Sequence, residues 1–157
     1  MKIQRNISKR QFILSVFVSI ILFFMSIGLA YPQKMDNDAN KLIGTWFGTH
    51  KQSDVEGDIQ TISTPYSNGA FFIKFRVIQN NRPVLEQNEL GTWKLKDNRQ
   101  ITIITTHING QHLGKDKYIT DNYVIRKLTD SEQDCDHVET GTKFKYIRVN
   151  DQFKFQQ

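Results

Sequence analysis

Residues 70–78 read AFFIKFRVI, and this stretch decides the fold class. Four of its apolar residues occupy every second position: Phe71, Ile73, Phe75 and Val77. Lys74 and Arg76 fall on the other face, beside Phe72. Because successive side chains of an extended chain point to opposite faces, this period of two predicts a β-strand with one apolar face. The sequence Ser67-Asn68-Gly69 precedes the strand and is typical of a tight turn.

Seven further segments have the composition of strands and are separated by turn-forming residues. They span residues 42–51, 59–66, 84–95, 100–108, 117–128, 136–140 and 142–149. Short strands at regular spacing predict a sandwich or a barrel, and hairpin connections indicate an antiparallel meander. Closing such a meander removes both exposed edges. We therefore predict an all-β fold in which about eight strands close into a barrel.

The segments around these strands complete the predicted organisation. Residues 31–40, YPQKMDNDAN, are polar and aperiodic and predict a linker. The barrel domain is expected to cover residues 41–151, and residues 152–157 form a tail. Within the domain, residues 130–134 are expected to form a polar loop. Gly91, inside a predicted strand, is expected to mark a bulge or a sharp bend.

Residues 1–30 have the organisation of a secretory signal peptide. Positions 2–10 hold four basic residues, and an uncharged apolar run extends from Phe12 to Leu29. The small residues Gly28 and Ala30 favour cleavage after Ala30. A run of this length can also span a bilayer, so an uncleaved N-terminal anchor is the alternative. Under both interpretations we expect export of the domain, to the periplasm or the medium, with no membrane contact beyond this segment.

The charge balance argues against a nucleic-acid-binding protein. The whole chain carries a net charge of +5, but residues 1–30 hold four of its basic residues and no acidic one. The remainder has 17 basic against 16 acidic residues, a net charge of +1. Nucleic-acid binders present a basic face, which this balance does not favour.

Residues that carry chemistry are sparse. Cys135 is the only cysteine, so no intrachain disulfide can form, and its acidic neighbours should raise its pKa. His107 and His112 flank the Asn109-Gly110 turn, but no pair of histidines has a spacing diagnostic of metal ligands. Phosphate-binding loops, serine elbows and zinc-protease motifs are absent from the sequence. We therefore expect no enzymatic activity, no cofactor and no metal site.

The start and the end of the domain carry a family resemblance. Gly44-Thr45-Trp46 lies in the first predicted strand, and Arg148 lies in the last. This combination resembles the calycin superfamily, and the chain is most similar to small bacterial exported lipocalin-like domains. The resemblance implies that Trp46 closes one end of the barrel and that Arg148 packs across its indole. The chain departs from larger calycins in having no room for a helical lid and no helix after the last strand.

The resemblance and the apolar strand faces together suggest a ligand site inside the barrel. The candidate ligand-binding residues are Phe71, Ile73, Phe75, Trp93, Tyr123, Tyr146 and Arg148. Tyr146 and Arg148 share a strand face and could hold a ligand carboxylate; alternatively, Arg148 only packs against Trp46.

Two functions follow, and the volume of the interior distinguishes them. The favoured function is that of an exported β-barrel that binds a small apolar or amphipathic ligand. The alternative is a ligand-free module of the cell envelope that binds another protein. A drug-sized ligand needs a cavity of about 300 Å³ or more, whereas a filled interior favours the interaction module.

Overall fold

The computed structural model describes residues 37–52, 55–96 and 99–156. The predicted signal peptide and the first part of the predicted linker lie outside these ranges. Within them, no helix combines the length and the apolar character needed to span a bilayer.

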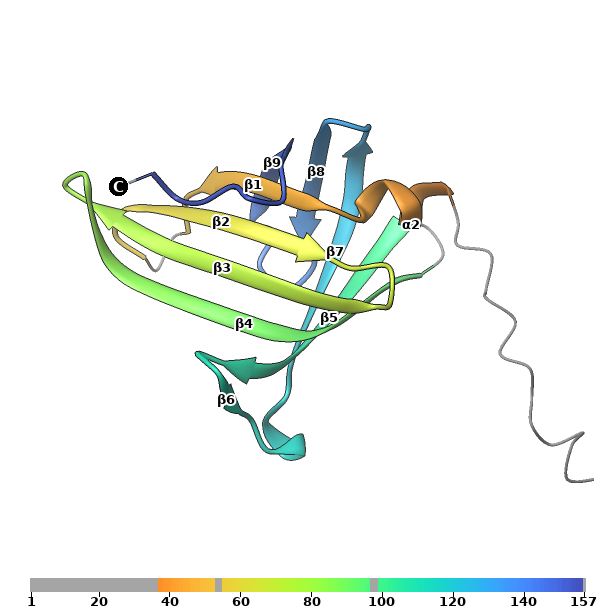
Figure 1. Ribbon diagram of the computed structural model, residues 1–157, viewed down its shortest axis with the longest axis horizontal. Coiled ribbons are helices and arrows are strands. Elements are labelled where there is room, and N and C mark those ends of the chain that lie inside the picture. Colours follow the sequence, from red (N-terminus) through yellow and green to blue (C-terminus); the bar gives the residue numbers. More distant parts are fainter. Residues whose placement is uncertain (1–36, 53–54, 97–98, 157) are drawn as a thin grey trace, which may run out of the picture. The chain divides into compact units, whose positions relative to one another are not determined.

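The described residues form strands with two short helical segments (Figure 1). In chain order the elements are α2 (Asn37–Leu42), β1 (Thr45–His50), β2 (Asp58–Pro65), β3 (Ala70–Gln79), β4 (Arg82–Lys96), β5 (Gln100–Ile108), β6 (Gln111–His112), a 3-10 turn (Lys115–Lys117), β7 (Ile119–Leu128), β8 (Glu132–His137) and β9 (Lys143–Val149).

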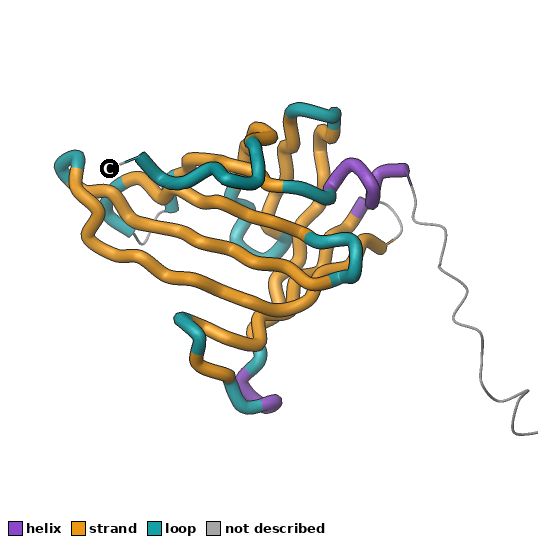
Figure 2. Tube along the Cα trace, in the orientation of Figure 1, coloured by secondary structure: helices purple, strands orange, loops and turns teal. Residues whose placement is uncertain are grey.

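Eight of these strands close into an antiparallel barrel. Their order around the barrel is β1, β2, β3, β4, β5, β7, β8 and β9, and β9 returns to pair with β1. Within the described residues, strand β6 pairs only with β5 and forms a small hairpin that projects from the barrel (Figure 2). The predicted all-β closed barrel is therefore confirmed. It is compatible with a calycin-like fold.

The strand register separates an inner face from an outer face. Residues directly opposite each other in an antiparallel pair share a face. Trp46 lies opposite both Ser63 and Arg148, and Ser63 lies opposite Ile73. Since Trp46 is buried, the alternating apolar side chains of β3 all face the interior, as the sequence pattern predicts.

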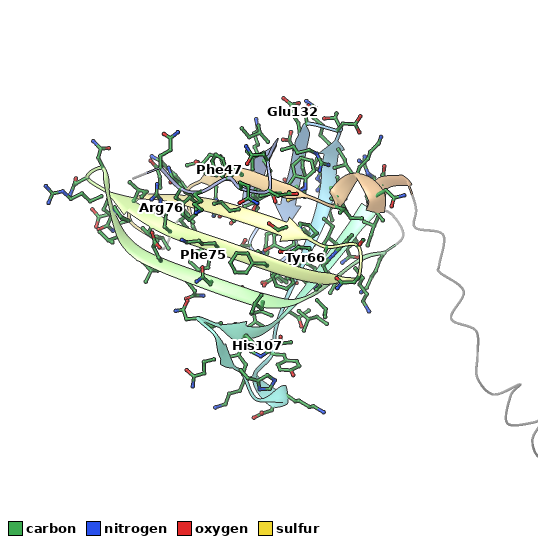
Figure 3. All side chains as sticks on the ribbon, in the orientation of Figure 1. Phe47, Tyr66, Phe75, Arg76, His107 and Glu132 are labelled. Atoms are coloured by element: carbon green, nitrogen blue, oxygen red, sulfur yellow. The ribbon has the colours of Figure 1, made fainter. Side chains whose placement is uncertain are left out.

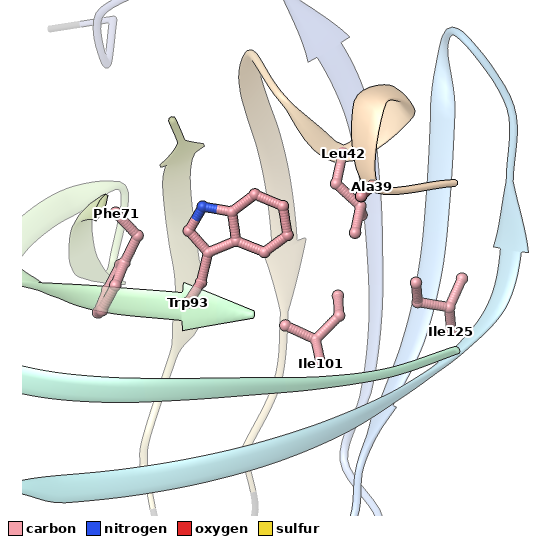
Figure 4. Close-up of a cluster of buried hydrophobic side chains, with 6 residues drawn as sticks. All are labelled: Ala39, Leu42, Phe71, Trp93, Ile101 and Ile125. Carbon is pink, nitrogen blue, oxygen red and sulfur yellow. The ribbon is translucent and has the colours of Figure 1, made fainter. Parts of the chain in front are cut away.

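A buried apolar cluster fills one end of the barrel (Figure 4). Its members come from the helix and from four strands: Ala39, Leu42, Phe71, Trp93, Ile101 and Ile125. The Trp93 indole donates a hydrogen bond of 2.9 Å to the Tyr66 carbonyl, which satisfies its single polar atom. Helix α2 lies over this end and contributes Leu42, of which 1% is exposed.

Two boundaries differ from the sequence prediction. Residues 37–40 were expected in a linker but belong to helix α2, because Ala39 and Leu42 give this short segment an apolar side to bury. The seventh barrel strand was expected at 136–140 after a polar loop at 130–134, but β8 covers Glu132–His137. Its inward residues are Gln133, Cys135 and His137, so hydrophobic alternation does not reveal this strand.

The predicted tail packs across the outside of strands β1, β2 and β3. The Phe153 ring lies 5.0 Å from the Phe47 ring, and the Gln156 carbonyl accepts a 2.6 Å hydrogen bond from Arg76. The Phe155 ring lies 4.5 Å from the Arg76 guanidinium carbon. This segment therefore covers outward side chains that a bare sheet face would expose.

Candidate binding sites inside and outside the barrel

Trp46 and Arg148 pack together at the closed end of the barrel. Only 1% of Trp46 is exposed, and its indole nitrogen donates a 2.7 Å hydrogen bond to the Leu42 carbonyl. The Arg148 guanidinium carbon lies 4.2 Å from the centroid of the Trp46 ring, which is a cation–π arrangement. Gly44 has a φ of +119°, and a side chain there would overlap the guanidinium. Glycine therefore permits this close approach.

The guanidinium N–H groups of Arg148 donate hydrogen bonds to backbone carbonyl oxygens. Its Nε donates to the Asp130 carbonyl at 2.5 Å, its Nη1 donates to the Ile43 carbonyl at 2.6 Å, and its Nη2 donates to the Lys41 carbonyl. These bonds join the end of α2 and the β7–β8 turn to the last strand. The geometry gives Arg148 a structural role and leaves little of it to bind a ligand carboxylate.

The barrel interior holds a cavity of about 50 Å³. Five of the seven predicted ligand residues line this cavity: Phe71, Ile73, Trp93, Tyr123 and Tyr146. Phe75 and Arg148 do not line it. The volume is far below the roughly 300 Å³ that a drug-sized ligand needs, because the aromatic rings fill the interior themselves.

Two tyrosines in the interior are held in their neutral form. Burial raises the pKa of the Tyr123 hydroxyl, and the Asp121 carboxylate raises it further. Burial also raises the pKa of the Tyr146 hydroxyl well above its usual value. Both groups can therefore donate hydrogen bonds inside the barrel at any physiological pH.

Cys135 lines the same cavity as these tyrosines, and its thiol has low nucleophilic reactivity. Burial is the main cause that raises the pKa of its thiol to about 12, and the Asp136 and Asp134 carboxylates add to the shift. Only 4% of the residue is exposed. The acidic neighbours noted in the sequence therefore contribute less than desolvation does.

We predict that Cys135 resists alkylation in the folded protein. At pH 8 a thiol with a pKa near 12 is only about one part in ten thousand thiolate, the reactive form. Mass spectrometry after iodoacetamide treatment should find the native protein unmodified and the denatured protein singly modified. Labelling of the native protein as fast as of the denatured protein would show that this side chain is accessible and ionisable.

His137 faces the interior near the opposite end from Trp46. Its Nε2 lies 3.2 Å from an Asp121 oxygen and 3.5 Å from a Glu139 oxygen. The Tyr123 ring lies 5.0 Å from the imidazole ring. Across the three described ranges, no group of three or more histidine, cysteine or carboxylate side chains has the geometry of a metal site.

A larger hollow lies outside the barrel, as a groove of about 680 Å³ beside the C-terminal segment. We call it the outer groove. Its floor consists of outward side chains of β2, β3 and β4, and its walls are the tail, the residues before β1 and the β2–β3 turn. The lining includes Ile62, Thr64, Tyr66, Phe72, Lys74, Arg76, Glu86, Asp151, Phe153, Lys154 and Phe155.

The outer groove combines aromatic rings with cationic groups, and Figure 3 labels one of each, Tyr66 and Arg76. The Lys74 amine nitrogen lies 5.4 Å from the centroid of the Phe155 ring. The Arg76 guanidinium carbon lies 4.5 Å from the same centroid. Only 9% of Arg76 is exposed, and it forms hydrogen bonds to Gln60 and to the Gln156 carbonyl. Among the residues that the structure describes, Arg76 forms no ion pair, whereas Lys74 lies 3.5 Å from a Glu86 oxygen.

Sequence reasoning placed the ligand site inside the barrel and missed the outer groove. The alternation of β3 assigns Lys74 and Arg76 to the outer face, where charged residues usually meet solvent. The signal for a covered outer face was present in the tail, where Phe153 and Phe155 alternate with Lys154 as in a strand-like segment.

No protein-family model and no curated protein matches this chain.

Proposed function

We propose that this protein is an exported, calycin-like binding protein that holds a small amphipathic anion in its outer groove. The observation that carries the proposal is the contrast in volume between the groove, about 680 Å³, and the interior cavity, about 50 Å³. Ligand sites in proteins usually have volumes of about 300–1,000 Å³. The volume of the groove lies within this range, and the volume of the interior cavity lies below it. Export rests on the N-terminal sequence.

The side chains of the groove suit a ligand with an apolar body. Phe72 and Tyr66 line one part of it, and Phe153 and Phe155 line the side formed by the tail. Tyr66 is 46% exposed, so a bound molecule could remove a large aromatic surface from water.

The charges of the groove suit an anionic head group. Three cationic residues, Lys74, Arg76 and Lys154, line it against two acidic residues, Glu86 and Asp151. Asp151 accepts a 3.0 Å hydrogen bond from the Thr45 hydroxyl, which partly occupies its carboxylate. The guanidinium of Arg76 is desolvated, and a charge removed from water gains most from a partner of opposite sign. A carboxylate or phosphate group next to Phe155 would supply that partner.

The proposal is one of binding rather than catalysis. The one cysteine is buried with a raised pKa, so it is a poor nucleophile. The groove itself contributes amines, a guanidinium, carboxylates and aromatic rings, which recognise a ligand without an activated nucleophile among them.

We predict that dodecanoate raises the melting temperature of the protein and that Phe72→Glu removes the shift. The ligand stabilises the folded state by mass action, and a carboxylate at position 72 would repel the head group and wet the apolar floor. Ile104→Glu is the matched control, because Ile104 faces outward from β5, away from the groove lining. Differential scanning fluorimetry of both variants, each checked for native circular dichroism, makes the comparison.

A shift that survives Phe72→Glu, or one that Ile104→Glu also removes, would contradict a site in the outer groove. Dodecanol tests the head group, because it has the same chain without the charge. An equal shift with dodecanol would show that the cations do not take part.

A cell-envelope interaction module is the second candidate. The β3–β4 hairpin exposes two neighbouring apolar side chains, with Val84 55% and Leu85 50% exposed. Exposed apolar residues that gather at one place often mark a contact with another protein. If no amphipathic probe shifts the melting temperature, this candidate becomes the preferred function.

A further inference from the structure

The β5–β6 hairpin brings two histidines together outside the barrel. His107 and His112 lie directly opposite each other in its register, and their ring centroids are 4.8 Å apart. The turn between them uses Asn109 and Gly110, both with positive φ, which is the backbone of a tight two-residue hairpin. Directly opposed residues of such a hairpin share one face, so both imidazoles lie on the same side.

Each imidazole has one nitrogen engaged and one available. The Nδ1 of His107 lies 2.9 Å from the Thr106 hydroxyl, and the Nε2 of His112 lies 3.1 Å from the Tyr118 hydroxyl. Within the described part of the chain, His107 Nε2 and His112 Nδ1 form no hydrogen bond. His112 is exposed and His107 is half-buried, so both rings can be reached from solvent.

We propose that His107 and His112 chelate one divalent transition-metal ion through these two nitrogens. An ion bound at about 2.0–2.1 Å from each nitrogen needs the two donors roughly 3 Å apart, a separation that ring rotation can reach from the observed centroid distance. Water completes the coordination sphere. Imidazole nitrogen selects Cu²⁺, Ni²⁺ and Zn²⁺ over the oxygen-preferring ions Mg²⁺ and Ca²⁺.

The surroundings of the pair support this assignment. Tyr118 is a positioning residue: its hydroxyl fixes the His112 ring through the nitrogen that the metal does not use, as the hydrogen-bonded partners of metal-ligating histidines do. The two rings meet edge to face with an interplanar angle of 74°, so they are not stacked flat against each other. The separation of the two residues along the chain is not diagnostic, and only the hairpin register reveals the pair.

The test is a metal titration of the full chain without an affinity tag. We expect isothermal titration calorimetry to show one Cu²⁺ or Ni²⁺ ion bound per chain, and electron paramagnetic resonance of the Cu²⁺ form to show two nitrogen ligands. His107→Gln and His112→Gln should each weaken binding by at least about 10-fold, and Tyr118→Phe should weaken it less. His50→Gln is the matched control, because His50 lies on β1 outside the hairpin.

Several results would overturn the site. One is Cu²⁺ affinity that is unchanged in both hairpin variants, and another is a spectrum without two imidazole nitrogens. Equal binding of Ca²⁺ would also exclude it. The proposal is independent of the outer groove, because Phe72→Glu leaves the hairpin intact and should not alter metal binding.

Discussion

Replacing Trp46 with alanine is expected to lower the free energy of unfolding by about 3–5 kcal/mol, the usual cost of removing a large aromatic side chain from a core. Trp46 is 1% exposed and carries three interactions that the substitution removes: core packing, the hydrogen bond to Leu42 and the stacking against Arg148. The free energy of unfolding of a domain of this size is about 5–15 kcal/mol, so the expected loss is a large share of the total stability. Urea denaturation followed by circular dichroism measures it.

Trp46→Phe separates the packing of the ring from its hydrogen bond. It keeps most of the apolar volume and leaves the Leu42 carbonyl without its donor, so a cost of roughly 1–3 kcal/mol is expected. A Trp46→Ala variant with the stability of the parent protein would show that this end of the barrel does not depend on the indole. Trp93, the other tryptophan of the chain, reports folding by fluorescence in both variants.

Gly91→Ala is expected to destabilise the barrel by at least about 1–3 kcal/mol, the usual cost of overpacking. A methyl group at position 91 would overlap the Ile104 carbonyl oxygen and approach the Phe71 ring to 2.7 Å. The oxygen belongs to the backbone of the neighbouring strand, so it can move only if the β4–β5 pairing changes. The strand register shifts between Leu90 and Gly91, which confirms the expected irregularity at this glycine.

Thr92→Ala is the matched control for this substitution. Thr92 lies next to Gly91 on the same strand, but it is exposed and faces outward. Its replacement should change the unfolding free energy by about 0.5 kcal/mol or less. If Gly91→Ala costs no more than Thr92→Ala in parallel denaturation curves, the close approach of β4 and β5 is not required.

The barrel could be predicted from the sequence because most of its strands alternate apolar and polar side chains. Strand β3 is the clearest case, with Phe71 and Val77 buried inside as the pattern requires. Strand β8 could not be found in this way, because Gln133 and His137 face inward and place polar groups where the pattern requires apolar ones. Hydrophobic periodicity detects burial of apolar groups only.

The interior cavity and the outer groove depend on contacts between segments that are distant along the chain, and no local sequence pattern indicates such contacts. The volume of the interior is decided by how the rings of Phe71, Trp93 and Tyr123 fill it, and strand faces alone do not determine this. The outer groove exists because the tail lies beside β2 and β3, and Arg76 bonds to a carbonyl 80 residues away. The histidine pair, by contrast, is local, and the hairpin turn at Asn109-Gly110 was visible in the sequence.

The closure of β9 onto β1 has a consequence for folding kinetics. All other pairs around the barrel join strands that neighbour each other along the chain, apart from the short β6 excursion. The β1–β9 seam joins residues about a hundred positions apart, as in the bond from Arg148 to Ile43 across 105 residues. Forming this seam costs more loop-closure entropy than forming any other strand pair of the barrel, because the closed loop is the longest. Contacts between residues so far apart raise the contact order, and a high contact order slows folding. Synthesis from the N-terminus adds a delay, because β1 waits for its last neighbour until β9 has left the ribosome.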